Sequence, residues 1–112
     1  MFARRNLPEV SAAAVGEDTY VLDVRDPDEW VAGHPRGAVH LPMMEIPGRM
    51  SEIPQDRDVV VVCRVGGRSA QVVAYLQAQG YERVSNLEGG LFAWQAAGRE
   101  LISEDGQPAR VL

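Results

Sequence analysis

The sequence has no lysine, a single cysteine and no long apolar run, and these shortages narrow the classes of protein to consider. One cysteine excludes an internal disulfide and a zinc site made of several thiolates. No apolar run approaches the length of a membrane span, and none follows Arg4 and Arg5 as a secretory signal requires. A free thiol without such a signal suits a reducing compartment, so we expect a cytoplasmic protein in which Cys63 is available as a thiol.

The charge of the chain excludes further partners. All 11 basic residues are arginine, and 16 acidic residues leave a formal net charge of −5. The acidic residues are spread along the chain, so it offers no basic surface to nucleic acid or to an anionic membrane. We therefore expect neither as a partner.

The length and composition indicate one globular domain over residues 1–112. The chain is 46% hydrophobic and 24% charged, without a repeat or a low-complexity tract. Apolar runs alternate with helix-like segments, which predicts an α/β fold with a central, mostly parallel sheet flanked by helices. We expect a core over about 18–98 and a polar C-terminal tail over 99–112.

Most elements can be placed from local patterns. Asp26 suits the N-cap of a short helix and Pro27 its first position, whereas Gly80 and Gly98 suit the ends of two later helices. Residues 43–53 fit a helix interrupted at Pro47-Gly48. The remaining expectations are strands over 20–24, 38–41, 59–62 and 83–85, and helices over 69–79 and 91–97.

The run Val59–Val62 is followed directly by the cysteine. Four consecutive valines indicate a strand buried on both faces, as in the middle of a parallel sheet. Ligands of such sheets bind beyond the carboxyl ends of the strands, where Cys63 is expected to lie. A cysteine in this position is also commonly a small core residue, so its interpretation depends on the residues that follow.

The residues that follow favour a negative charge on the sulfur. Adjacent glycines let main-chain N–H groups approach a ligand closely, and the start of a helix adds partial positive charge. A nucleotide-binding loop is an alternative, but no lysine follows the glycines and no spaced glycine triplet is present. We therefore favour Cys63 as a nucleophile whose binding loop comprises Arg64, Val65, Gly66, Gly67, Arg68 and Ser69.

Four motifs occur in order between Asp18 and about Gly98. They are VLDVRDPDEWVAGH (21–34), GAVHLP (37–42), VVVVCRVGGRSAQVVAYLQAQGY (59–81) and NLEGGLFAW (86–94). Together they make the chain similar to the single-domain rhodaneses, which are thiosulfate sulfurtransferases. The resemblance implies a rhodanese-like α/β fold in which Cys63 is the nucleophile and main-chain N–H groups of residues 64–68 surround the bound sulfur.

The resemblance also implies a reaction that needs neither a metal nor another cofactor. Cys63 would take the outer sulfur of thiosulfate or a similar donor as a persulfide and pass it to cyanide, a thiol or a partner protein. Arg64 and Arg68 would hold the sulfonate end of the donor, with Arg68 also setting the shape of the loop. The alternative is a persulfide carrier or regulatory sulfur-binding module with little turnover of thiosulfate.

Two details of the loop refine the expected chemistry. Four residues separate Cys63 from Arg68, whereas related phosphatases have one more, so the shorter loop favours sulfur transfer over phosphate chemistry. Val65 stands where many relatives have a small polar residue, which implies one hydrogen bond fewer to a bound oxyanion.

The remaining polar and aromatic residues of the motifs are expected to support the fold. Asp23 and Arg25, at the end of a strand, suggest an ion pair or a hydrogen-bonded turn. The two histidines, His34 and His40, match no metal-ligand spacing and fit hydrogen-bonded turns instead. We expect Trp30 and Trp94 to anchor the core, with a place at the border of the pocket as the alternative for Trp94. We expect residues 88–90 to form a packing turn, with lining of the site as the alternative.

Overall fold

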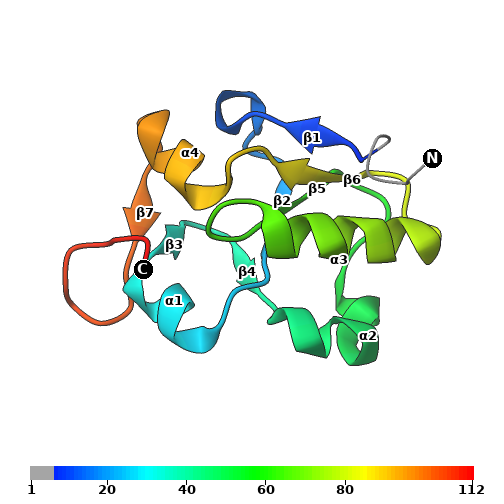
Figure 1. The fold of residues 1–112 in the computed structure, drawn as a ribbon, viewed down its shortest axis with the longest axis horizontal. Helices are drawn as coiled ribbons and strands as arrows, with labels where there is room; N and C mark the ends of the chain where they lie inside the picture. Colours follow the sequence, from blue (N-terminus) through cyan, green and yellow to red (C-terminus); the bar gives the residue numbers. More distant parts are fainter. Residues whose placement is uncertain (1–6) are drawn as a thin grey trace.

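The structure is a computed structural model that describes residues 7–112. Its centre is a five-stranded sheet in which every pairing is parallel (Figure 1). This confirms the α/β fold with a central, mostly parallel sheet. The strands, in spatial order, are β1 (Glu9–Val10), β6 (Val84–Leu87), β5 (Val59–Val62), β2 (Tyr20–Asp23) and β4 (Val39–His40).

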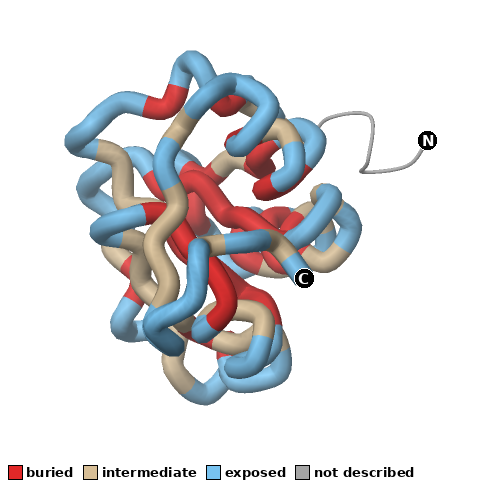
Figure 2. The backbone as a smooth tube through the Cα atoms, turned by 90° about the vertical axis from the view of Figure 1, so that its left-hand side faces the viewer, coloured by how far each residue is buried: buried red, intermediate tan, exposed pale blue. Residues whose placement is uncertain are grey.

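The valine run forms the middle strand of this sheet, as predicted. β5 pairs with β2 on one side and with β6 on the other, and all four valines are buried. Figure 2 shows buried segments in the interior of the molecule, with exposed segments around them. Successive side chains of a strand point to opposite faces. Accordingly, Val59 and Val61 pack with α3 (Gly67–Ala78) and α2 (Ile46–Arg49), whereas Val60 and Val62 pack with α4 (Gly90–Ala96).

The first helix, α1 (Pro27–Ala32), begins where the sequence predicts. Asp26 is its N-cap and forms a capping box with Glu29, in which each side chain accepts a hydrogen bond from the other residue's main-chain N–H. Pro27 occupies the first turn, where its missing N–H leaves no hydrogen bond unmade.

Residues 43–52 are helical, but the interruption expected at Pro47-Gly48 is wrong. Both residues lie inside α2, because proline is tolerated in the first turn of a helix. The breaks fall on either side of α2, where it is flanked by two short 3₁₀ helices, Met43–Glu45 and Met50–Glu52.

The two later helices begin slightly earlier than the sequence suggests. α3 begins at Gly67 rather than at residue 69, and α4 at Gly90 rather than at residue 91. In both cases the preceding glycine is in the left-handed region, with φ of 113° at Gly66 and 75° at Gly89. That conformation turns the chain within one residue, so the helix forms sooner.

The segment after Gly98, expected to be a polar tail, has defined contacts with the rest of the chain. Its strand β7 (Leu101–Ile102) pairs antiparallel with β3 (His34–Pro35). The segment then passes beside α1, where the N–H of Arg110 donates to the main-chain oxygen of Ala32 at 3.0 Å (Figure 1). β1, β3, β7 and a 3₁₀ helix at Ala12–Ala14 were not expected from the sequence.

Two expectations concern membranes and secretion. Among the residues that the structure describes, no helix is long and apolar enough to cross a membrane. Arg4 and Arg5, considered above for a secretory signal, lie outside the described residues.

Candidate active site

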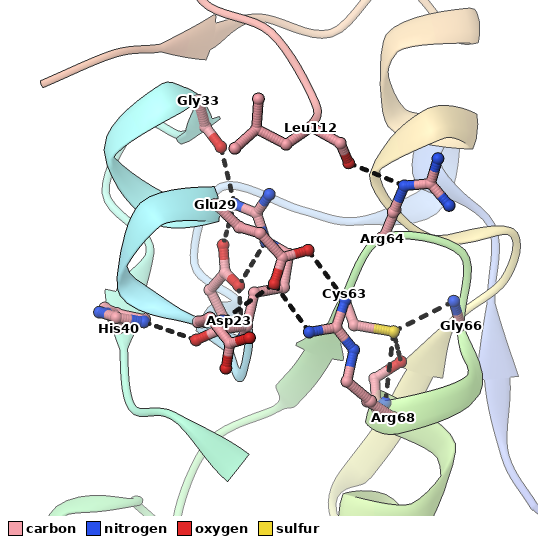
Figure 3. Close-up of polar contacts among 12 residues, drawn as sticks. Asp23, Glu29, Gly33, His40, Cys63, Arg64, Gly66, Arg68 and Leu112 are labelled. Atoms are coloured by element: carbon pink, nitrogen blue, oxygen red, sulfur yellow. Dashed lines mark hydrogen bonds and ion pairs between the residues drawn. The ribbon is translucent and has the colours of Figure 1, made fainter. Parts of the chain in front are cut away.

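Cys63 lies immediately beyond the carboxyl end of β5, and two main-chain N–H groups point at its sulfur (Figure 3). The N–H of Gly66 donates to Sγ at 3.1 Å and the N–H of Ser69 at 3.4 Å. The Ser69 hydroxyl also contacts the sulfur, at 3.2 Å. The residue is only 1% exposed, so the sulfur is a buried acceptor surrounded by hydrogen-bond donors.

The sequence places the donors over 64–68, and the structure refines this. Of residues 64–68, Gly66 is the one whose N–H reaches the sulfur. The second donor, Ser69, lies one residue beyond this span. Gly66 has a φ of 113°, which side-chain-bearing residues rarely adopt. Gly67 has no such requirement, and a Cβ added there would meet nothing within 4 Å. The conformation of Gly66 therefore directs the first N–H to the sulfur.

The first residues of the loop rest on the start of α4. The N–H of Leu91 donates to the main-chain oxygen of Cys63 at 2.9 Å, and the N–H of Phe92 donates to that of Arg64 at 3.4 Å. A Cβ at Gly90 would collide with the main-chain oxygen of Arg64, so the two segments pack without room for a side chain. The expectation that residues 88–90 form a packing turn is confirmed.

Arg68 connects the loop to α1. Its Nη1 and Nη2 donate to the two carboxylate oxygens of Glu29 at 2.8 and 2.9 Å (Figure 3). These hydrogen bonds hold the pKa of Glu29 below its ordinary value and raise the pKa of Arg68. A weaker contribution to the raised pKa of Arg68 comes from Cys63, which places the guanidinium within electrostatic reach of the sulfur.

Arg64 is directed away from the sulfur (Figure 3). Its Nε donates to the main-chain oxygen of Leu112 at 2.7 Å, and its guanidinium lies over the ring of Phe92 at 4.9 Å. Val65, which lies between Arg64 and Gly66, is 55% exposed. The structure thus brings Gly66 and Ser69 to the sulfur and leaves Arg64 and Val65 at the surface.

Asp23 and Arg25 form the structural ion pair that the sequence suggests. Arg25 donates from Nε and Nη2 to the two carboxylate oxygens of Asp23 at 2.8 and 2.7 Å, and both side chains are fully buried. Nη2 also donates to the main-chain oxygen of Gly33 at 2.7 Å. The pair therefore joins the end of β2 to the end of α1.

The two histidines are hydrogen-bonded, as expected, but they lie in strands β3 and β4 (Val39–His40) rather than in turns. His34 contacts Glu104 through Nε2 at 2.8 Å, and Nε2 of His40 donates to the main-chain oxygen of Arg25 at 2.8 Å. Within residues 7–112, no group of three or more histidine, cysteine, aspartate or glutamate side chains is placed to hold a metal ion.

The tryptophans differ from one another. Trp94 is a buried core residue, as predicted. Trp30 is only half-buried, so its expected role as a core anchor is wrong. It stacks on His34 with ring centroids 3.4 Å apart and on His40 at 4.9 Å, which holds the turn between β3 and β4.

Two residues beside the loop were not identified from the sequence. Glu29 stands within the first motif without an assigned role, yet its carboxylate holds Arg68. Asn86 lies on β6 beside Val61 of the central strand, and its side chain reaches Ser69 and Gly66. The motif NLEGG contained Asn86, but only its position in the sheet brings it to the loop.

Both the sequence and the fold of the chain match a known protein family. The sequence model of the rhodanese-like domain matches residues 7–97. The chain belongs to the rhodanese family. A solved rhodanese-related protein from Thermoplasma volcanium superposes with a TM-score of 0.79 at 28% identity, over 85% of this chain and 97% of that one.

Relatives of this rhodanese carry names that refer to sulfur transfer. It is 51% identical over 90 residues to a sulfurtransferase of Allochromatium vinosum, covering 80% of this chain and 84% of the relative. It is 34% identical over 93 residues to the thiosulfate sulfurtransferase GlpE of Pseudomonas entomophila, covering 83% and 85%. It is 30% identical over 95 residues to the putative sulfur carrier protein YrkF of Bacillus subtilis, covering 80% and 51%. These names support a sulfurtransferase activity for the family member described here.

Proposed function

We propose that this rhodanese transfers a sulfane sulfur through a persulfide on Cys63. The observation that carries the proposal is the convergence of the Gly66 and Ser69 N–H groups on one sulfur beyond the carboxyl end of β5. Hydrogen bonds to a charged group are stronger than those between neutral groups, so this arrangement stabilises a thiolate and, later, an anionic persulfide. The start of α3 immediately behind the loop adds partial positive charge.

The reaction has two displacements. The Cys63 thiolate attacks the outer sulfur of thiosulfate, a new S–S bond forms, and the original S–S bond breaks so that sulfite leaves with its electron pair. A second nucleophile then attacks the outer sulfur of the persulfide and releases the Cys63 thiolate. We propose a cellular thiol or a partner protein as this acceptor, with cyanide as its substitute in an assay. A reducing compartment, most simply the cytoplasm, suits this cycle because the resting thiol must stay reduced.

The rest of the loop would bind the donor. Arg68 lies within electrostatic reach of the sulfur, and its pairing with Glu29 fixes the loop relative to α1. The exposed Arg64 offers a second cation to a sulfonate if its contact with Leu112 is exchanged for the donor. Only four residues separate Cys63 from Arg68, so the loop is short, and a short loop favours binding of a single sulfur atom over a phosphate group.

A persulfide carrier is the second candidate. Cys63 is only 1% exposed, and this burial favours a carrier, because a small donor must displace a covering group before it can reach the sulfur. The similarity to YrkF points the same way. A carrier would accept sulfur from a protein donor and turn over thiosulfate slowly.

Intact-protein mass after incubation with thiosulfate tests the proposal. The wild type should gain the mass of one sulfur atom, and a reducing thiol should remove it. Cys63→Ser should gain nothing, since no other cysteine is present. If the wild type gains no sulfur from thiosulfate or from a persulfidated protein donor, the proposal is wrong. Gain from the protein donor alone would favour the carrier.

A further inference from the structure

The Ser69 hydroxyl lies between two buried groups that compete for its single proton. Its oxygen is 3.2 Å from the sulfur of Cys63, and it donates its hydrogen bond to Oδ1 of Asn86. Ser69 is fully buried and Asn86 is 2% exposed, so water does not compete for either contact. Because a hydroxyl carries one hydrogen, Ser69 cannot donate to the sulfur while it donates to Asn86.

Two acceptors fix the orientation of the Asn86 amide. Its Nδ2 donates to the main-chain oxygen of Gly66 at 3.2 Å and to Oε2 of Glu9 at 3.3 Å. Turning the amide by half a rotation would place Oδ1 against both of those oxygens, leaving acceptor facing acceptor at two positions. Oδ1 therefore faces Ser69 and accepts the hydrogen bond from its hydroxyl.

We propose that Asn86 is a positioning residue that withholds the Ser69 proton from Cys63. In the resting state the thiol S–H donates to Ser69, and Ser69 donates to Asn86, so every partner is satisfied. When the thiol proton leaves to solvent, the lone pairs of Ser69 face a negative sulfur. The hydroxyl can rotate to the sulfur only by leaving Oδ1 of Asn86 without its donor. An unsatisfied buried acceptor is unfavourable, so this rotation is opposed.

This arrangement opposes the N–H groups of Gly66 and Ser69, which favour the thiolate. The balance has a chemical use, because a thiolate that is stabilised too strongly is a weaker nucleophile. Asn86 would thus set how much of the sulfur is ionised at rest while Gly66 and Ser69 hold it in place. The inference rests on the proposed role of Cys63 as the reactive thiol.

The test is a pH titration of thiolate ultraviolet absorbance, taken as the difference from Cys63→Ser, which has no cysteine but keeps the three tyrosines. In Asn86→Ala the hydroxyl proton becomes free to reach the sulfur, so the midpoint should move to lower pH by about one unit, the size of one hydrogen bond to a charged group. Ser69→Ala alone should not raise the midpoint, although it would if Ser69 were a simple donor to the thiolate.

The double variant separates this effect from a distortion of the loop. In a Ser69→Ala background, Asn86→Ala should leave the midpoint where Ser69→Ala set it, whereas a loop distortion would shift both backgrounds. Asn86→Leu, which keeps the volume, should match Asn86→Ala. An unchanged midpoint in Asn86→Ala and Asn86→Leu, or an equal shift in the Ser69→Ala background, would overturn the inference. Persulfide formation is measured separately, so failure of the proposed function remains distinguishable.

Discussion

Arg68 and Glu29 are joined by two parallel hydrogen bonds of 2.8 and 2.9 Å, which connect the loop after Cys63 to the first turn of α1. Planar pairing of this kind fixes orientation as well as distance. The Glu29 side chain is 13% exposed and that of Arg68 33%, so the pair is better shielded than the other arginine pairs at the surface. The same carboxylate also accepts the N–H of Asp26 at 3.0 Å, so one side chain both caps a helix and holds the loop.

This pair predicts a pH dependence of stability. Hydrogen bonds from Arg68 hold the pKa of Glu29 below its ordinary value of 4.5. A carboxyl whose pKa is lower in the folded state stabilises the protein above its unfolded pKa and loses that contribution as the pH falls through the folded pKa. Glu29→Gln should therefore lower the free energy of unfolding by on the order of 1 kcal/mol near neutral pH. The difference from wild type should shrink as the pH falls below 4.5.

Urea denaturation over a series of pH values measures this difference. Glu100→Gln is the matched control, since Glu100 also pairs with an arginine, Arg36, but both side chains are well exposed. The control should change stability less near neutral pH, where the Glu29 pair contributes most. A Glu29→Gln difference that stays constant into acid would contradict the assignment of the effect to the ion pair.

The two glycines of the loop predict different outcomes for the same substitution. Gly66→Ala forces a side chain into a φ of 113° and displaces the N–H that points at Cys63. Persulfide formation should slow on the order of tenfold or more, because a displaced donor no longer stabilises the charged sulfur. Gly67→Ala is the control, since its conformation accepts alanine and its Cβ meets nothing within 4 Å. Rapid mixing with thiosulfate followed by mass analysis compares the rates, and equal rates would refute the role of Gly66.

The parts of the fold that the sequence predicts are those with local causes. The valine run of β5 and the start of α1 at Asp26 and Pro27 each lie within a few consecutive residues, and the structure places both as expected. β7 differs, because its pairing with β3 joins His34 to Ile102 through strands of two residues each. So short a strand has no periodicity to recognise, and only the folded chain brings its partner beside it.

The site divides in the same way. Cys63, Gly66 and Arg68 lie close together in the sequence and follow a recognisable strand, so they can be named before the structure is known. Asn86 reaches the loop from the neighbouring strand, and Glu29 reaches it from α1. Their roles depend on distances across the fold, which no local pattern records.

Gly90, at the start of α4, predicts how far the loop depends on close packing. Gly90 and Gly98 both have positive φ, at 65° and 79°, so alanine is strained at either position. A Cβ at Gly98 meets nothing within 4 Å, whereas one at Gly90 collides with the main-chain oxygen of Arg64. Gly98→Ala should destabilise by about 1 kcal/mol through conformation alone. Gly90→Ala should destabilise more and also slow persulfide formation, because the loop must move away from α4 to admit the methyl group. Thermal unfolding and the thiosulfate reaction test both variants. If the two lose equal stability and Gly90→Ala retains the wild-type rate, contact with α4 does not hold the loop in its active shape.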